Sequence, residues 1–216
     1  MLNSTLYNGL EKGKLYVISG KPKVGKTSFA LHLYEQLCKD KNLQDNSYGI
    51  ISYSIKNDFI KGFEDMELLK VVVDYQLLNN SCNILFFDIK IKPELQNQYY
   101  SDNEIWHTFF KSLKQEITKD KAGAVLILPI PFEDKNTNEQ SITEDTDSLL
   151  YYYNQADKIL LLNRPTYFDE NKGEQFGTTY LNVIDLTTKE TKQIKYIADF
   201  KNAVFESVEE NNCPQH

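Results

Sequence analysis

The segment from Gly20 to Thr27 holds the residues whose types and spacing could do chemistry. It reads Gly-Lys-Pro-Lys-Val-Gly-Lys-Thr, which fits the pattern G-x-x-x-x-G-K-[ST] of loops that bind nucleotide phosphates. In such a loop the glycines let backbone N–H groups turn toward the phosphates, and the following helix adds a partial positive charge. Lys26 is expected to reach the β- and γ-phosphate oxygens, and Thr27 is expected to hold Mg²⁺. The residues predicted to bind the nucleotide here are Gly20, Lys21, Pro22, Lys23, Val24, Gly25, Lys26, Thr27 and Ser28.

The sequence on either side of this loop agrees with the prediction. Residues 15–19 form a short apolar run typical of a buried strand. The stretch from Ser28 to Cys38 repeats apolar residues at helical spacing, with Phe29 and Leu33 on one face. A phosphate loop requires this order of strand, loop and helix, so the flanking elements argue against the alternative of a chance match in a turn rich in Gly, Pro and Lys.

A second candidate for the magnesium site is the carboxylate of Asp88. Residues 83–87 are continuously apolar, apart from the first, as in a strand buried within a parallel sheet, and Asp88 closes the run. Such a strand delivers an acid to the carboxyl edge of the sheet, where the phosphate loop also opens. The competing apolar run at 124–128 is followed by Pro129 and offers no acid. Asp88 is therefore predicted to hold Mg²⁺ together with Thr27. The alternative is an ordinary turn residue, because aspartate often begins turns.

Length and composition restrict the class of protein. With 216 residues we expect a single domain over residues 1–205 and a disordered tail over 206–216. No stretch has the length of a membrane span or the pattern of a signal peptide, so we expect a soluble, cytoplasmic protein. The cysteines and histidines show no spacing typical of a disulfide framework or a zinc site. The net charge is −7 and Arg164 is the only arginine, which makes strong, self-sufficient nucleic-acid binding unfavourable.

The order of the elements predicts an α/β fold. Strand-like runs alternate with helical patterns, and two segments rich in β-branched and aromatic residues flank a turn near the C-terminus. We therefore expect a mostly parallel central sheet flanked by helices, with a C-terminal antiparallel hairpin. The further predicted elements are strands at 48–54, 71–73, 124–128 and 158–162, helices at 56–69 and about 103–119, a surface loop at 133–146, and hairpin arms at 180–184 and 193–196.

These motifs, in this order, resemble the RecA-like ATPase domain of the DnaB-type replicative helicases. The segment from Leu10 through the phosphate loop to Ala30 is similar to that family's approach to its own loop. The segment from Ala156 to Tyr167 resembles its A-D-x-h-h-x-h-x-R-P-x-Y pattern, where h is apolar, and Val204-Phe205-Glu206 resembles its closing strand. RadA-like and KaiC-like ATPases share the same core.

The resemblance covers most of the chain and carries several implications. It implies ATP and Mg²⁺ as cofactors and a role in DNA replication or in the maintenance of mobile elements. It implies single-stranded DNA, a replication-type protein or a further copy of the chain as partners. It also implies that Arg164 contacts the nucleotide or braces the loop that follows its strand, and both readings stay open.

The chain departs from this family at the positions where hydrolysis needs particular side chains. A serine stands where the family's catalytic glutamate ends the second strand, so the attacking water lacks an obvious base. A proline-flanked segment replaces a polar glutamine, and an acid and a threonine replace the lysine and arginine that reach the neighbouring subunit's nucleotide. These departures are Ser54, the segment 129–131, Asp185 and Thr187, and the nearest replacements are Asp58, Lys189 and Lys192.

Three functions therefore remain to be distinguished. The first is a degenerate DnaB-like domain that binds ATP, hydrolyses it slowly or not at all, and acts as a nucleotide-dependent binding or regulatory module. The second is an active DNA-dependent ATPase or helicase subunit whose missing groups come from elsewhere. The third is an interaction protein that does not bind nucleotide. Loss of a trans arginine alone is worth about 10³ to 10⁵ in rate, which favours the first.

Overall fold

The computed structural model describes a large part of the chain, including the phosphate loop and the C-terminal strands. The described residues are 10–11, 13–21, 23–39, 47–55, 82–91, 110–111, 113–115, 117–118, 123–127, 153–164 and 176–208. The predicted elements at 56–69, 71–73 and 133–146 lie outside these ranges, as do Pro22, Asp58 and the segment 129–131.

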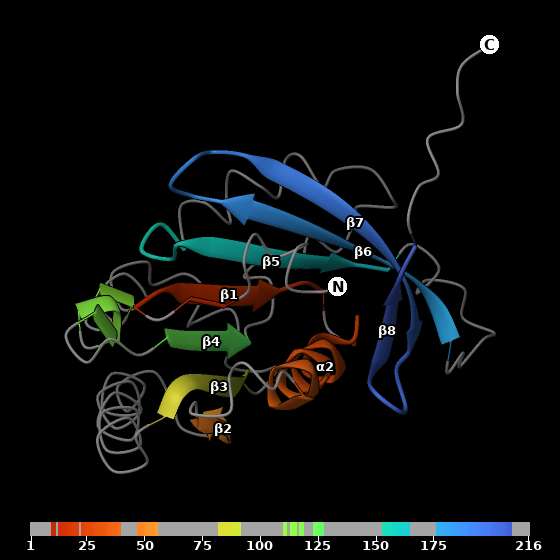
Figure 1. Cartoon of the computed structure of the whole chain (residues 1–216), viewed down its shortest axis with the longest axis horizontal. Helices are drawn as coiled ribbons and strands as arrows, with labels where there is room; N and C mark the ends of the chain where they lie inside the picture. The colour runs from red at the N-terminus through yellow and green to blue at the C-terminus, as the bar shows by residue number, and fades with distance from the viewer. Residues whose placement is uncertain are drawn as a thin grey trace.

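One mixed β-sheet organises the described residues (Figure 1). Its strands follow the order β2-β3-β4-β1-β5-β6-β7-β8. The pairings from β2 to β5 are parallel, and those from β5 to β8 are antiparallel. The elements are β1 (Leu15–Ser19), α2 (Lys26–Lys39), β2 (Ser47–Ile55), β3 (Cys82–Ile91), β4 (Gly123–Ile127), β5 (Lys158–Asn163), β6 (Phe176–Asp185), β7 (Thr191–Asp199) and β8 (Val204–Ser207).

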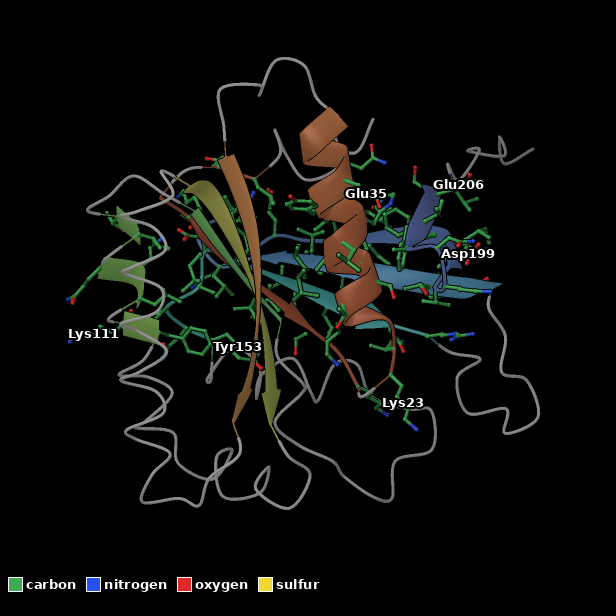
Figure 2. The ribbon with its side chains drawn as sticks, turned by 90° about the horizontal axis from the view of Figure 1, so that it is seen from below. Lys23, Glu35, Lys111, Tyr153, Asp199 and Glu206 are labelled. Carbon is green, nitrogen blue, oxygen red and sulfur yellow. The ribbon has the colours of Figure 1, made fainter. Side chains whose placement is uncertain are left out.

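The central strand β1 is buried along its whole length because both faces of the sheet are covered. Tyr16 and Ile18 pack on the side of α2, in one core cluster with Phe29 and Leu33. On the other side of the sheet lies the helical segment that carries Lys111 (Figure 2). Burial on both faces explains why β1 is continuously apolar rather than alternating.

The helical segment around residues 110–118 carries the apolar face expected of the predicted helix at 103–119. Its described residues Phe110, Leu113 and Ile117 are buried. The Phe110 ring meets the ring of Tyr153 edge to face, with 5.5 Å between the centroids. Leu113 and Ile117 were predicted to face the core, and the structure confirms both; the N-terminal part of the predicted helix lies outside the described residues.

Aromatic side chains join α2 to the C-terminal strands. The ring of Phe29 lies 5.9 Å from that of Tyr196 in β7 and 5.2 Å from that of Phe205 in β8, both edge to face. Such pairs add to the free energy gained by burying the rings, by about 0.5–1.5 kcal/mol each. The last strands of the chain are therefore part of the core that holds α2, and not an appended hairpin.

The amino edge of the sheet is tied together by Asp157, which directly precedes β5. Its carboxylate accepts a hydrogen bond from the Leu15 backbone N–H at 2.7 Å and another from the Lys114 ammonium. A third contact, at 3.3 Å, comes from Lys14, whose side chain is more exposed. One carboxylate thus joins β1, the start of β5 and the helical segment on the second face of the sheet.

Most differences from the sequence prediction concern where elements begin and end. Strand β1 begins and ends as predicted, and α2 extends the predicted helix at both ends. Strand β3 does not end at Asp88 but continues to Ile91, because β2 continues alongside it and pairs with every added residue. The antiparallel part has three strands rather than a hairpin, since β8 pairs with β7 and runs through Ser207, beyond the predicted domain end at 205.

Candidate phosphate-binding site

The phosphate loop connects the carboxyl end of β1 to the start of α2, and its backbone requires glycine at two positions. Gly20 and Gly25 have φ values of 152° and 100°, which side chains disfavour. Gly20 is also crowded, because a Cβ there would lie 2.6 Å from the carbonyl oxygen of Leu162 in β5 and 2.8 Å from Val24. Lys23 has a φ of 62° and an exposed side chain, and it lies in the turn just before α2 (Figure 2).

The ammonium group of Lys26 lies within this loop. Its Nζ donates hydrogen bonds to the carbonyl oxygens of Gly20 at 2.8 Å and Lys21 at 2.9 Å. Hydrogen bonds from a charged donor are stronger than neutral ones, so Lys26 links the first residue of α2 to the beginning of the loop. The same ammonium places a positive charge beside the N–H groups of the turn.

The N-terminal turn of α2 adds to this positive potential. The first hydrogen bond of the helix runs from the Phe29 N–H to the Gly25 carbonyl oxygen at 2.8 Å, so the preceding N–H groups point out of the helix end. The first turn contains no acidic residue to cancel the partial charge of the helix dipole. Thr27 is exposed here, whereas the Ser28 hydroxyl donates to the Phe200 carbonyl oxygen at 3.0 Å.

The register of the sheet places the backbone of Asp88 level with the end of β1. Asp88 pairs with Ile127 of β4, and Ile127 pairs with Ile18 of β1. Because Ile18 is followed by Ser19 and then Gly20, Asp88 lies in the row of the sheet just before the phosphate loop begins. Strand β4 separates this row's position on β3 from β1.

Arg164 lies at the carboxyl end of β5, beside the loop, and stacks on an aromatic ring. Its guanidinium carbon is 4.2 Å from the centroid of the Phe200 ring. Gly177 of β6 lies against the guanidinium, since a Cβ there would be 3.1 Å from both Nε and Nη2. The face of Phe200 and the backbone of Gly177 therefore both bound the position of the guanidinium.

The residues in place of the family's catalytic groups take other positions. Ser54 pairs with Lys90 at the row beyond that of Tyr53 and Ile89, near the end of β2. Asp185 ends β6 at the amino edge of the sheet, paired with Lys158, at the end of β5 opposite to the phosphate loop.

The Asp185 carboxylate is occupied by the turn that it begins. It accepts hydrogen bonds from the N–H groups of Thr187 and Thr188, both at 2.9 Å, and pairs with Lys158 at 3.4 Å. Desolvation opposes ionisation, but these N–H groups and Lys158 outweigh it and lower the pKa of Asp185. In this turn Lys189 has a φ of 60° and is exposed, at the same amino edge of the sheet.

Two residues that the sequence analysis did not single out complete the surroundings of the loop. Phe200, in the turn between β7 and β8, contacts the loop, and Leu162 presents its carbonyl oxygen to Gly20. Phe200 is 172 positions from Ser28, to which it is hydrogen-bonded. No local sequence pattern reports a contact over that separation; the only signal was an aromatic residue in an Asp-x-x-Asn turn.

A glycine-rich loop between a central strand and a helix, on a sheet with parallel strands on both sides of it, defines a class of α/β phosphate-binding domains. No protein-family model matches the sequence, and no curated protein matches it. Among solved structures, the ATPase domain of a DnaB-like helicase is similar, with a TM-score of 0.58 and 12% sequence identity over 94% of this chain and 87% of that chain. At this identity the likeness shows the fold alone. Within the described part of the chain, none of the helices is both long and apolar enough to cross a lipid bilayer.

Proposed function

We propose that this chain binds ATP with Mg²⁺ as a DnaB-helicase-like domain with impaired hydrolysis, and that it acts as a nucleotide-dependent binding or regulatory module. The observation that carries the proposal is the position of Lys26. Its ammonium lies inside a glycine-shaped loop, at hydrogen-bonding distance from Gly20 and Lys21, and at the N-terminus of a helix whose first turn has no acid. Loop amides, helix dipole and ammonium together favour a polyphosphate anion.

The metal ion of this proposal is held by Thr27 and Asp88. Thr27 follows Lys26 and is exposed at the helix start, and the register of the sheet brings the Asp88 backbone to the row of Ile18. A hydroxyl and a carboxylate from neighbouring elements are ligands that suit Mg²⁺, which otherwise keeps its waters and the phosphate oxygens. The ion would bridge the phosphates and neutralise part of their charge.

Impaired hydrolysis follows from what surrounds this site. Strand β2, from Ser47 to Ile55, contains no acid that could orient an attacking water. Asp185 is engaged with Lys158 and two turn amides at the opposite edge of the sheet. Binding uses groups of the loop itself, whereas acceleration of phosphoryl transfer requires charged groups beyond it. The fold similarity to an ATPase domain agrees with the binding half of the proposal.

A titration with a fluorescent ATP analogue and Mg²⁺ tests the binding half, with Lys26→Ala as the variant. Loss of charge-assisted hydrogen bonds to phosphate should weaken binding by about 10- to 100-fold. The matched control is Lys111→Ala, an exposed lysine on the opposite side of the sheet from α2, which should bind as the wild type does (Figure 2). Thermal unfolding of each protein separates a lost contact from a lost fold.

Phosphate release in the same samples tests the hydrolysis half, with and without single-stranded DNA. Lys26-dependent binding with no release above background is the expected result. Release that single-stranded DNA stimulates, and that Lys26→Ala abolishes, would instead establish the alternative of an active DNA-dependent ATPase or helicase subunit. A wild-type chain that binds no nucleotide would refute the proposal and favour an interaction protein.

A further inference from the structure

The turn between β7 and β8 is held in one shape by its own hydrogen bonds. Oδ1 of Asp199 accepts from the N–H groups of Lys201 and Asn202, both at 3.1 Å, and Oδ2 accepts from the Asn202 side chain at 2.8 Å. Ala203 completes the turn with a φ of 54°. An Asp that caps its own turn in this way fixes the direction of the next residue, which here is Phe200.

Phe200 contacts the phosphate loop through both its backbone and its ring. Its carbonyl oxygen accepts the Ser28 hydroxyl at 3.0 Å, which joins it to the first turn of α2. Its ring lies against Gly25 so closely that a Cβ on Gly25 would be 2.6 Å from Cδ1 and Cε1. Both contacts are made to residues that determine where α2 begins.

The ring of Phe200 is supported from the core and by Arg164. The Phe205 ring packs against it edge to face, with the centroids 5.7 Å apart, and Phe205 is itself buried. The Arg164 guanidinium stacks over the Phe200 ring, and Gly177 leaves the space that the guanidinium occupies. A planar cation on an aromatic ring is a favourable pair that lysine reproduces poorly.

We propose that Phe200 is a positioning residue that holds Gly25 and the first turn of α2 in the phosphate-binding shape, and that Arg164 acts through Phe200. The inference rests on the proposed function, because it assigns a role at the same site. It differs from a role in which Phe200 or Arg164 recognises the base. A residue that shapes the loop affects every polyphosphate equally, whereas a residue that stacks on a base affects only nucleotides.

The test compares ATP with inorganic tripolyphosphate, each with Mg²⁺, by isothermal titration of wild type and Phe200→Ala. We expect Phe200→Ala to weaken both ligands by the same factor, about tenfold, which is the loss of one charge-assisted hydrogen bond. Phe200→Leu keeps apolar bulk beside Gly25 and should recover part of the affinity. The control is Val204→Ala, an exposed position at the end of the same turn, which should change neither affinity. Weaker binding of ATP with unchanged tripolyphosphate would overturn the proposal in favour of base stacking.

Arg164→Lys tests the second half. If Arg164 acts through Phe200, the double variant with Phe200→Ala should bind both ligands as weakly as Phe200→Ala alone, because the effects are not additive. Additive losses would mean a direct contact between Arg164 and the ligand, and would overturn this half.

Hydrogen exchange without any ligand keeps the two proposals separate. Phe200→Ala should speed exchange of the Phe29 amide, which bonds to the Gly25 carbonyl oxygen, at least about tenfold more than that of Leu33 one turn later. Unchanged exchange at Phe29 would overturn the positioning role whether or not nucleotide binds. Faster exchange in a chain that binds no nucleotide would leave the positioning role standing and remove only the proposed function.

Discussion

Replacing Gly20 by alanine separates the steric demand of the phosphate loop from the general effect of placing alanine at a positive φ. Gly20 has a φ of 152°, and its missing Cβ would lie 2.6 Å from the Leu162 carbonyl oxygen and 2.8 Å from Val24. Gly13 offers a matched control, because it has a φ of 76° and no atom within 4 Å of the same built position. Both variants add one methyl group at a backbone conformation that favours glycine.

The expected costs differ because only one site is crowded. Gly13→Ala should lower the free energy of unfolding by about 1–2 kcal/mol, the usual cost of alanine in the left-handed region. Gly20→Ala adds an overpacking cost of about 1–3 kcal/mol to a backbone strain of about 1–3 kcal/mol. The total of roughly 2–6 kcal/mol is a large part of the stability of an ordinary domain, about 5–15 kcal/mol. The loop can lower this cost only by moving away from Leu162, which also moves the carbonyl oxygen that Lys26 contacts.

Urea unfolding and ATP titration of the two variants measure the difference. Gly20→Ala should be the less stable protein and should lose nucleotide binding even where it remains folded. Gly13→Ala should bind as the wild type does. The steric reasoning fails if Gly20→Ala is as stable as Gly13→Ala and still binds ATP with wild-type affinity.

Two further predictions concern the rest of the fold. Asp157→Ala removes the acceptor of the Leu15 N–H and the partner of Lys114, so urea unfolding should show a loss of about 3 kcal/mol, with a smaller loss for Asp157→Asn; a change within about 0.5 kcal/mol would contradict the assigned role. Burial raises the pKa of Tyr196 from 10.0 to about 12, so the folded state keeps its proton at pH values where the unfolded state loses it. Stability should therefore fall between about pH 10 and 12, and less steeply in Tyr196→Phe when unfolding is measured across that range; an identical slope in both proteins would contradict the burial effect.

The local parts of the site could be predicted from the sequence because their signals are contiguous. The strand from Leu15 to Ser19, the loop and the helix after it are specified by neighbouring residues, through apolar runs, glycines and helical spacing. The end of β3 was predicted wrongly because Asp88 was read as the last residue of a strand. Residues 89–91 alternate apolar and charged side chains, a pattern equally compatible with continued pairing, and the neighbouring strand β2 decides between the two.

The contacts across the sheet could not be predicted in this way. Phe200 meets Gly25 only because β7 and β8 return to the carboxyl edge of the sheet, and this depends on the pairing of β6 with β5. Arg164 was recognised as a residue of interest from its motif, but both of its readings stayed open. Its stacking on Phe200 and its contact with Gly177 are long-range facts, and they supply the geometry for the brace.

The same distinction between local and distant groups explains why binding could persist where hydrolysis does not. The phosphate-binding groups lie in one short segment, so drift elsewhere in the sequence leaves them intact. The groups that accelerate phosphoryl transfer come from separate strands, and β2 and the β6–β7 turn no longer supply them. The contact between Phe200 and Gly25 has a further consequence, because packed interfaces respond to small shifts by rearranging. If phosphate binding moves Gly25, it must also move Phe200 and the turn to β8, which gives a nucleotide-dependent module a physical route from its loop to its C-terminal strands.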